Sequence, residues 1–145
     1  MIAFAGFDHI DCRVRSLATV ESFYDALMAE LGLPRKRRSY VDEAGEWHDV
    51  SAGGAYNTIE FYEEERPDRA TFFIGFIERH DHVPAMTRIA FRVDSSRMFE
   101  LESLLPRLGA RNLERSENLG AYPAIFFEDP AGTRLEIVAR TARPS

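Results

Sequence analysis

The sequence predicts an α+β fold made of two βαβββ modules, with about eight strands and two main helices forming a cupped mixed sheet. Two observations predict it: a strand-like segment recurs half a chain later, and an amphipathic helical segment follows each copy. At 145 residues, the chain has the length of one domain that can bury a hydrophobic core. We therefore expect a single domain, with module one over residues 5–79 and module two over residues 85–141.

The recurring strand covers His9–Val14 in the first half and Arg88–Val93 in the second half. Apolar and polar residues alternate in each copy, which is typical of a half-buried strand. The apolar residues of the two copies match in order: Ile10, Cys12 and Val14 with Ile89, Phe91 and Val93. His9 and Arg88 therefore hold equivalent positions, and both face away from the apolar side.

An amphipathic helix is predicted after each copy, because apolar residues recur at spacings of three and four. These residues are Val20, Phe23, Tyr24, Leu27, Met28 and Leu31, and then Met98, Leu101, Leu104, Leu105 and Leu108. Gly32 and Gly109 follow the two stripes, at the place where glycine commonly ends a helix. The candidate N-caps are Ser16 or Thr19 for the first helix and residues 94–96 for the second.

Strand-like sequence follows each predicted helix. In the second half it covers residues 111–115, 122–128 and 134–140, and Asp129–Gly132 has the Pro and Gly positions of a type I turn. In the first half it covers residues 36–41, 47–62 with a break at Gly53-Gly54, and 71–77. Each module is thus a strand, a helix and further strands.

Charge and composition limit the partners. The net charge of −6 argues against a nucleic-acid partner, and the basic run Arg35–Arg38 is interpreted as a solvated strand. A single cysteine fits a reducing compartment, and no apolar run approaches the roughly 20 residues that span a bilayer. Residues 2–7 are too short and lack the basic start of a signal peptide. We therefore expect a cytoplasmic protein with a small-molecule partner.

Two groups of motifs resemble a known superfamily. Asp8-His9-Ile10, Phe23-Tyr24 and Leu31-Gly32-Leu33 resemble the opening of glyoxalase and bleomycin-resistance proteins, and Phe126–Ile137 is similar to their closing segment. By their order and duplication, the chain is identified as a divergent single-domain member of the vicinal oxygen chelate superfamily, which also includes extradiol dioxygenases. The resemblance implies a homodimer, often with each cup built from both chains. It does not settle the activity, because the superfamily contains isomerases, epimerases, dioxygenases, thiol transferases and metal-free binding proteins.

The resemblance also implies a divalent metal ion (zinc, nickel, manganese or iron). Its ligands would come from the first strand of each module and the last strand of the second, which places them at His9, Arg88 and Glu136. Strand alternation puts His9 and Glu136 opposite the apolar residues of their strands, toward the cup. Arg88 breaks the ligand pattern, because a guanidinium has no lone pair for a cation.

Two further residues are candidates for the third ligand: Glu60, one strand before the expected position, and His82, whose alternative interpretation is a solvated loop histidine. The fourth ligand of isomerase members falls near Phe73 or Ile74, and neither side chain ligates a metal. If Arg88 has replaced the ion, no metal is expected, and Arg88 would pair with Glu136 or bind an anion.

Three functions stay open. The first is isomerase or lyase chemistry on a small carbonyl compound with an atypical metal site, in which Glu136 and Arg88 are the candidate catalytic residues and Glu136 or Glu60 moves a proton. The second is metal-free binding of a small molecule, with Arg88 as the anion anchor. The third is ring-cleaving dioxygenase activity, which the missing second histidine disfavours. The candidate substrate-binding residues are Arg88, Trp47, Phe73 and Tyr122, and Phe7, Tyr56 and Phe72 are further aromatic candidates.

Overall fold

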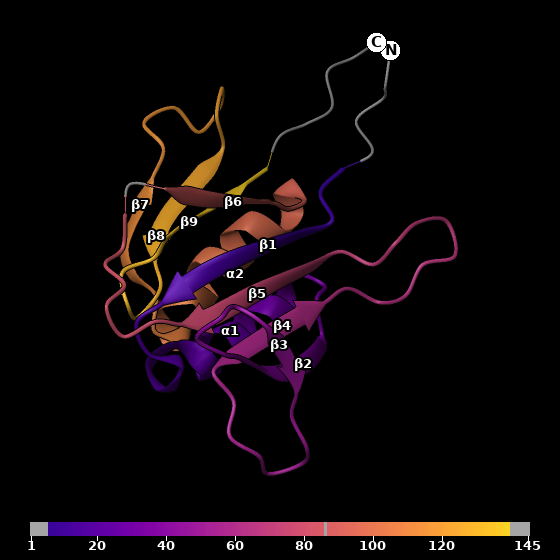
Figure 1. Ribbon diagram of the computed structural model, residues 1–145. Coiled ribbons are helices and arrows are strands. Elements are labelled where there is room, and N and C mark those ends of the chain that lie inside the picture. The colour runs from indigo at the N-terminus through magenta and orange to yellow at the C-terminus, as the bar shows by residue number, and fades with distance from the viewer. Residues whose placement is uncertain (1–5, 86, 140–145) are drawn as a thin grey trace, which may run out of the picture. The chain divides into compact units, whose positions relative to one another are not determined.

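The computed structural model describes residues 6–85 and 87–139 (Figure 1). The elements in chain order are β1 (His9–Val14), α1 (Leu17–Glu30), β2 (Arg35–Val41), β3 (Trp47–Asp49), β4 (Thr58–Tyr62), β5 (Phe73–Glu78), β6 (Arg88–Arg92), α2 (Ser95–Leu108), β7 (Arg111–Arg115), β8 (Ala124–Glu128) and β9 (Arg134–Val138). Two helices and two mixed sheets confirm the predicted α+β fold of two βαβββ modules. The strand-like segment predicted over residues 47–62, with a break at Gly53-Gly54, is two strands, β3 and β4, and the loop between them is longer than the predicted break. The predicted module limits and the predicted last strand include residues 5, 86, 140 and 141, which lie outside the described residues.

The first sheet contains five strands in the order β1-β5-β4-β2-β3. β1 is parallel to β5, and the other pairs are antiparallel. One row across the sheet is Asp11, Gly75, Glu60 and Arg37, each beside the next. Paired residues point to the same face of a sheet, so these four residues define what we call the polar face of the first sheet. The alternate residues of β4 and β5 point to the opposite face and are fully or almost fully buried: Ile59, Phe61, Ile74 and Phe76.

The second sheet contains four strands in the order β6-β9-β8-β7. β6 is parallel to β9, which places Arg88 beside Arg134 and Ala90 beside Glu136. Glu136 also lies beside Phe126 of β8. What we call the polar face of the second sheet is the face that carries Arg88, Ala90, Phe126, Arg134 and Glu136. Its opposite face is buried through Ile125, Phe127, Leu135 and Ile137.

Both helices end as their glycines predict. Gly32 and Gly109 have positive φ angles of 83° and 103°, the left-handed conformation that glycine adopts without strain. The helices start where two of the candidate caps predict, directly after Ser16 and Asp94, but the contacts at these starts are not the expected side-chain caps. The Leu17 amide donates to Glu78 Oε2 over 2.8 Å, so a side chain of β5 satisfies an amide of the first turn of α1. Asp94 stands at the N-cap of α2 but forms no side-chain capping bond.

The chain divides into two compact units: one holds β1 to β5, and the other holds Ala18–Leu27 of α1 together with β6 to β9 and α2. Within the second unit, the Tyr24 hydroxyl donates to Asp129 Oδ2 over 2.7 Å, and both residues are fully buried. Asp129 Oδ1 accepts the amides of Ala131 and Thr133 at 2.8 Å each, and the Gly132 amide donates to the Asp129 carbonyl. The turn predicted at Asp129–Gly132 is thus confirmed. No helix among the described residues is both long and apolar enough to cross a membrane.

Candidate functional site

Glu136, which is buried, and Tyr122, which is half-buried, form a hydrogen-bonded pair on the polar face of the second sheet. Glu136 is 5 % exposed, and its Oε1 accepts the hydroxyl of Tyr122 from the loop before β8. A buried carboxylate requires such a donor. Leaving a buried acceptor without a hydrogen bond destabilises a protein by about 1–3 kcal/mol. The structure therefore brings together two residues that the sequence predicted separately. The hydrogen-bond partner of Glu136 is Tyr122, whereas no ion pair joins it to Arg88 among the described residues.

Arg88 lies on the same face, at the edge strand β6. Its guanidinium carbon is 4.5 Å from the centroid of the Phe126 ring on β8, so the side chain reaches across β9. Within the described part of the chain, no carboxylate lies within the 4.0 Å ion-pair distance of its nitrogens, and Arg88 is exposed. The aromatic contact holds the guanidinium in place through a cation–π interaction, which uses none of its N–H groups as hydrogen-bond donors to a carboxylate. The arrangement suits the binding of an anion.

His9 lies between two carboxylates on β1. Its Nδ1 is 2.7 Å from Asp8 Oδ2, and its Nε2 is 3.7 Å from Asp11 Oδ2. The hydrogen bond with Asp8 raises the pKa of His9 above the usual 6.5, and the nearby charges of Asp11 and Glu60 act in the same direction. These contacts favour the imidazolium, in which both ring nitrogens carry protons and neither can bind a metal.

The ring of His9 also begins an aromatic row across the first sheet. It stacks on Phe73 with ring centroids 4.7 Å apart and planes inclined by 7°, and Phe73 stacks on Tyr62 at 4.7 Å. Arg35 on β2 follows, with its guanidinium carbon 6.0 Å from the Tyr62 centroid. Phe73, predicted to line a binding pocket, thus lies within this row on the polar face.

Glu60 is the buried carboxylate of the first sheet, at 4 % exposed. Its two oxygens accept the hydroxyls of Ser39 and Tyr62 at 3.2 Å each, and Arg37 Nε lies 3.9 Å away. Burial and the charge of Glu60 raise the pKa of Tyr62, which keeps the phenol protonated as a donor. Glu60 lies on β4, the strand before the last strand of module one, as the strand count predicted.

Gly75 gives this part of the sheet its shape. A Cβ atom at Gly75 would lie 2.9 Å from Asp11 Oδ1 and in ordinary contact, at 3.7 Å, with Glu60 Cγ, so the missing side chain makes room for the Asp11 carboxylate. The paired strands also correct the expected place of the fourth metal ligand. Phe73 pairs with His9 as Arg134 pairs with Arg88, so the module-one position equivalent to Glu136 is Gly75. The expectation of Phe73 or Ile74 is therefore wrong by two residues or one.

The other predicted residues lie apart from these groups. His82 stands in the loop after β5, and its amide donates to the Arg79 carbonyl over 2.9 Å. Trp47 is 45 % exposed on β3, at the edge of the first sheet. Tyr56 lies under the Arg38 guanidinium at 4.8 Å, and Phe7 is an exposed residue before β1. None of these contacts brings the side chain to Glu60 or His9.

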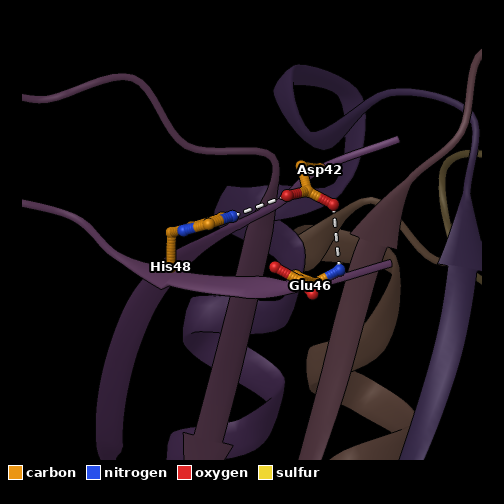
Figure 2. A group of neighbouring side chains, drawn as sticks. All are labelled: Asp42, Glu46 and His48. Atoms are coloured by element: carbon orange, nitrogen blue, oxygen red, sulfur yellow. Dashed lines mark hydrogen bonds and ion pairs between the residues drawn. The ribbon is translucent and has the colours of Figure 1, made fainter. Parts of the chain in front are cut away.

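Sequence reasoning missed a group of potential metal ligands in the β2–β3 hairpin (Figure 2). Ligand atoms of Asp42, Glu46 and His48 lie within 4.8 Å of one another, and no other group of three among the described residues has this spacing. Asp42 Oδ2 is 2.7 Å from His48 Nε2, and its Oδ1 accepts the Glu46 amide over 2.9 Å. The hydrogen bond with His48, followed by that of the Glu46 amide, lowers the pKa of Asp42. Both Asp42 oxygens thus close the turn, which accounts for the group by itself.

The three metal positions implied by the fold do not fit an ion in this chain. Arg88 is a permanent cation without a lone pair. The surroundings of His9 favour its protonated form, which leaves Glu136, whose Oε1 accepts one hydrogen bond from Tyr122, as the one remaining candidate ligand of the three. A metal site requires deprotonated ligands that are free to coordinate. No chemistry is therefore derived through a metal at these positions.

Comparison with solved structures places the fold. A glyoxalase/bleomycin resistance protein from Albidiferax ferrireducens T118 superposes with a TM-score of 0.58 and 17 % identity, covering 93 % of this chain and 98 % of that one. The fosfomycin resistance protein FosX from Mesorhizobium loti gives a TM-score of 0.52 and 18 % identity, covering 96 % and 94 %. A mutant of FosX from Listeria monocytogenes, complexed with Mn(II) and 1S,2S-dihydroxypropylphosphonic acid, gives 0.58 and 17 %, covering 96 % and 95 %.

No protein-family model matches the chain, and no curated protein sequence matches it significantly. The likeness to the solved structures therefore concerns the fold. At these identities it extends over nearly the whole length of each chain. The chain has the vicinal oxygen chelate fold, as found in glyoxalase/bleomycin-resistance and fosfomycin resistance proteins.

Proposed function

We propose that this protein binds a small organic anion on the polar face of the second sheet, without a metal ion, and that Arg88 is the anchor. The observation that carries the proposal is the Arg88 guanidinium, which lies 4.5 Å over Phe126 and has no carboxylate within ion-pair distance among the described residues. The planar fork of a guanidinium binds a carboxylate or phosphonate through two parallel hydrogen bonds. Arg88 thus offers positive charge at the place where the fold would otherwise hold a cation.

The neighbouring residues set the expected ligand class. Phe126 and the Tyr122 ring supply apolar surface beside the charge, so the ligand should carry a small apolar or aromatic group next to its anionic group. The buried Glu136 already accepts a hydrogen bond from Tyr122, so we do not expect the ligand to carry a cationic group that pairs with Glu136. The anion class, though not the absence of a metal, is supported by FosX structures of the same fold, which were solved with a phosphonic acid and with sulfate, each together with Mn(II).

A thermal-shift screen of carboxylates and phosphonates, run in the presence of a chelator, tests this function. A true ligand should raise the unfolding temperature in a concentration-dependent way. Arg88→Ala should lose the effect, whereas Arg92→Ala removes the same charge from the same strand and should retain it. Stabilisation that requires a divalent ion, or that persists in Arg88→Ala, would count against the proposal.

A second function is favoured by Glu60, which is a buried carboxylate with two hydroxyl donors. In this alternative the protein is an isomerase or lyase acting on a small carbonyl compound. Glu60 accepts a proton from the carbon next to the carbonyl and returns it to the product, so that protons balance over the reaction. The ring-cleaving dioxygenase gains no support, because Arg88 stands at the position of the second histidine.

Proton exchange tests the second function directly. If Glu60 moves a proton, small 2-oxoaldehydes or hydroxyketones incubated with the protein in D2O should gain deuterium at carbon, as followed by NMR. Glu60→Gln keeps the shape of the side chain and removes the base, so exchange should fall by at least about 100-fold. An unchanged exchange rate in Glu60→Gln would exclude Glu60 as the base.

We further propose, from the family resemblance, that the protein is a cytoplasmic homodimer. Light scattering coupled to size-exclusion chromatography measures the mass in solution, and a mass of a single 16.5 kDa chain at micromolar concentration would contradict the dimer.

A further inference from the structure

A groove beside β2 takes no part in either proposed function. It has a volume of about 590 Å³ and is lined by Lys36, Arg37 and Arg38 of β2, by Asp49 of β3, and by residues 50–54 and 56 of the following loop. A space of this size is within the range that holds small-molecule ligands. The sequence interpreted these basic residues as a solvated strand, which agrees with the exposure of Arg37 and Arg38, and the structure adds that they line this groove.

The loop that forms the opposite wall is fastened to β2 at both ends. At its start, Asp49 of β3 pairs with Ser39. At its end, the side chain of Asn57 exchanges two hydrogen bonds with the backbone of Val41: Nδ2 donates to the carbonyl over 2.7 Å, and Oδ1 accepts the amide over 2.8 Å. The groove is therefore held open by contacts that need no ligand.

Two glycines keep the wall of the groove bare. Gly53 has a positive φ of 78°, and the Gly54 amide donates to the Ser51 carbonyl over 2.9 Å in a tight turn. A Cβ atom at Gly54 would lie 3.0 Å from that carbonyl oxygen. A side chain at this point would disturb the turn that forms the wall.

The three basic residues differ in what they face. Arg37 points to the polar face of the first sheet and is paired with Asp49. Lys36 and Arg38 point to the opposite face, where the Lys36 ammonium lies 5.8 Å from the Phe61 centroid and the Arg38 guanidinium carbon lies 4.8 Å from that of Tyr56. Residues two apart on a strand are separated by about 6.6 Å. Two cations thus extend from the same face of β2, each against an aromatic ring.

We propose that this groove binds a small molecule that carries a diphosphate group, with Lys36 and Arg38 each holding one phosphate. Two cations on one side of the strand, in a groove whose one carboxylate, Asp49, is paired with Arg37, suit two linked anionic groups better than a single carboxylate, which one of the two would satisfy. Arg38 offers a fork of donors to one phosphate, and Lys36 offers a point charge to the other. The net charge of the chain, −6, disfavours a long polyanion, so the expected ligand is small.

Calorimetric titration of the full chain with inorganic pyrophosphate at constant ionic strength tests the proposal. We expect saturable binding of one pyrophosphate per chain, weakened at least about tenfold in the Lys36→Ala/Arg38→Ala double variant, because two charge-assisted contacts are lost. The Arg66→Ala/Arg107→Ala double variant removes the same charge from exposed sites outside the groove and should bind as the wild type does. A Lys36→Gln/Arg38→Gln variant, checked for folding by circular dichroism, guards against loss of structure.

Three outcomes would overturn the proposal. They are an absence of binding by the wild type, equal weakening in the Arg66→Ala/Arg107→Ala control, and sulfate binding as tightly as pyrophosphate. The proposal is independent of the anion site at Arg88, so Arg88→Ala should leave pyrophosphate binding unchanged. If Arg88→Ala instead abolishes it while the Lys36→Ala/Arg38→Ala variant keeps it, the anion belongs to the second sheet and the groove proposal is wrong.

Discussion

Gly75 in module one holds the position that Glu136 holds in module two. Each lies on the last strand of its module, Gly75 beside Asp11 of β1 and Glu136 beside Ala90 of β6. On the next strand of each sheet the glutamate is found in the other module. Glu60 of β4 is paired with Gly75, whereas the residue of β8 that is paired with Glu136 is Phe126. Both polar faces therefore have a buried glutamate, but in module one the glutamate comes from the neighbouring strand and lies against a glycine.

This relationship predicts that a side chain at Gly75 displaces the Asp11 carboxylate. In Gly75→Ala, the new methyl group would lie 2.9 Å from Asp11 Oδ1, so the carboxylate must move. Because that oxygen ends a flexible and partly exposed side chain, we expect a loss of only about 1 kcal/mol in the free energy of unfolding, at the low end of overpacking costs, measured by urea denaturation. In an Asp11→Ala background the same substitution should cost less, since the nearest atom is gone. Equal costs in both backgrounds would show that Asp11 is not the constraint.

The buried Tyr24–Asp129 bond should stabilise the second unit. Tyr24→Phe keeps the ring and removes the hydroxyl that donates to Asp129 Oδ2 over 2.7 Å. Asp129 is fully buried, so it loses a donor that water cannot replace, and we expect a destabilisation of about 1–3 kcal/mol. Thermal or urea unfolding measures this change. Tyr40→Phe, at a partly exposed tyrosine, is the matched control and should be close to neutral.

His9 should make the stability depend on pH in a defined direction. Its pKa in the folded protein is raised above 6.5 by the hydrogen bond with Asp8 and by the charges of Asp11 and Glu60. A raised pKa means that the stabilising contribution is fully present below pH 6.5 and is lost as the pH rises through the folded pKa. The stability difference between the wild type and His9→Gln should therefore shrink from pH 6 to pH 8.

NMR titration of the His9 ring gives the independent check. The pKa of the wild-type ring should lie above 6.5, and Asp8→Asn should bring it back toward that value because the principal hydrogen bond is lost. A His9 pKa below 6.5 would contradict the account of this residue, including the argument that it is a poor metal ligand.

The fold could be predicted from the sequence because its signals are local. The alternation in His9–Val14, the apolar stripe of α1 and the glycine after each helix all report on neighbouring residues along the chain. Over residues 47–62 the predicted break at Gly53-Gly54 was too short for the same reason, since the strand-like pattern continues past Asp49 although the chain leaves β2 there and returns as β4. Local pattern does not show where a strand stops pairing.

The candidate site could be predicted only in part. His9, Arg88 and Glu136 were identified by position, but their partners depend on which strands lie side by side. The order β1-β5-β4-β2-β3 places Glu60 beside Gly75, and the chain order of the strands does not reveal it. The contact of Tyr122 with Glu136 likewise depends on the path of the loop before β8. These lateral relationships required the structure.

The central claim is that Arg88 takes the place of a metal ion, and metal content tests it most directly. Purified protein is equilibrated with manganese, zinc, nickel or iron, freed of unbound ions and analysed by inductively coupled plasma mass spectrometry. We predict no stoichiometric metal that depends on His9 or Glu136, and any ion that persists in His9→Ala but is lost in His48→Ala belongs to the hairpin of Figure 2. One ion per chain that disappears in both His9→Ala and Glu136→Ala would contradict the account.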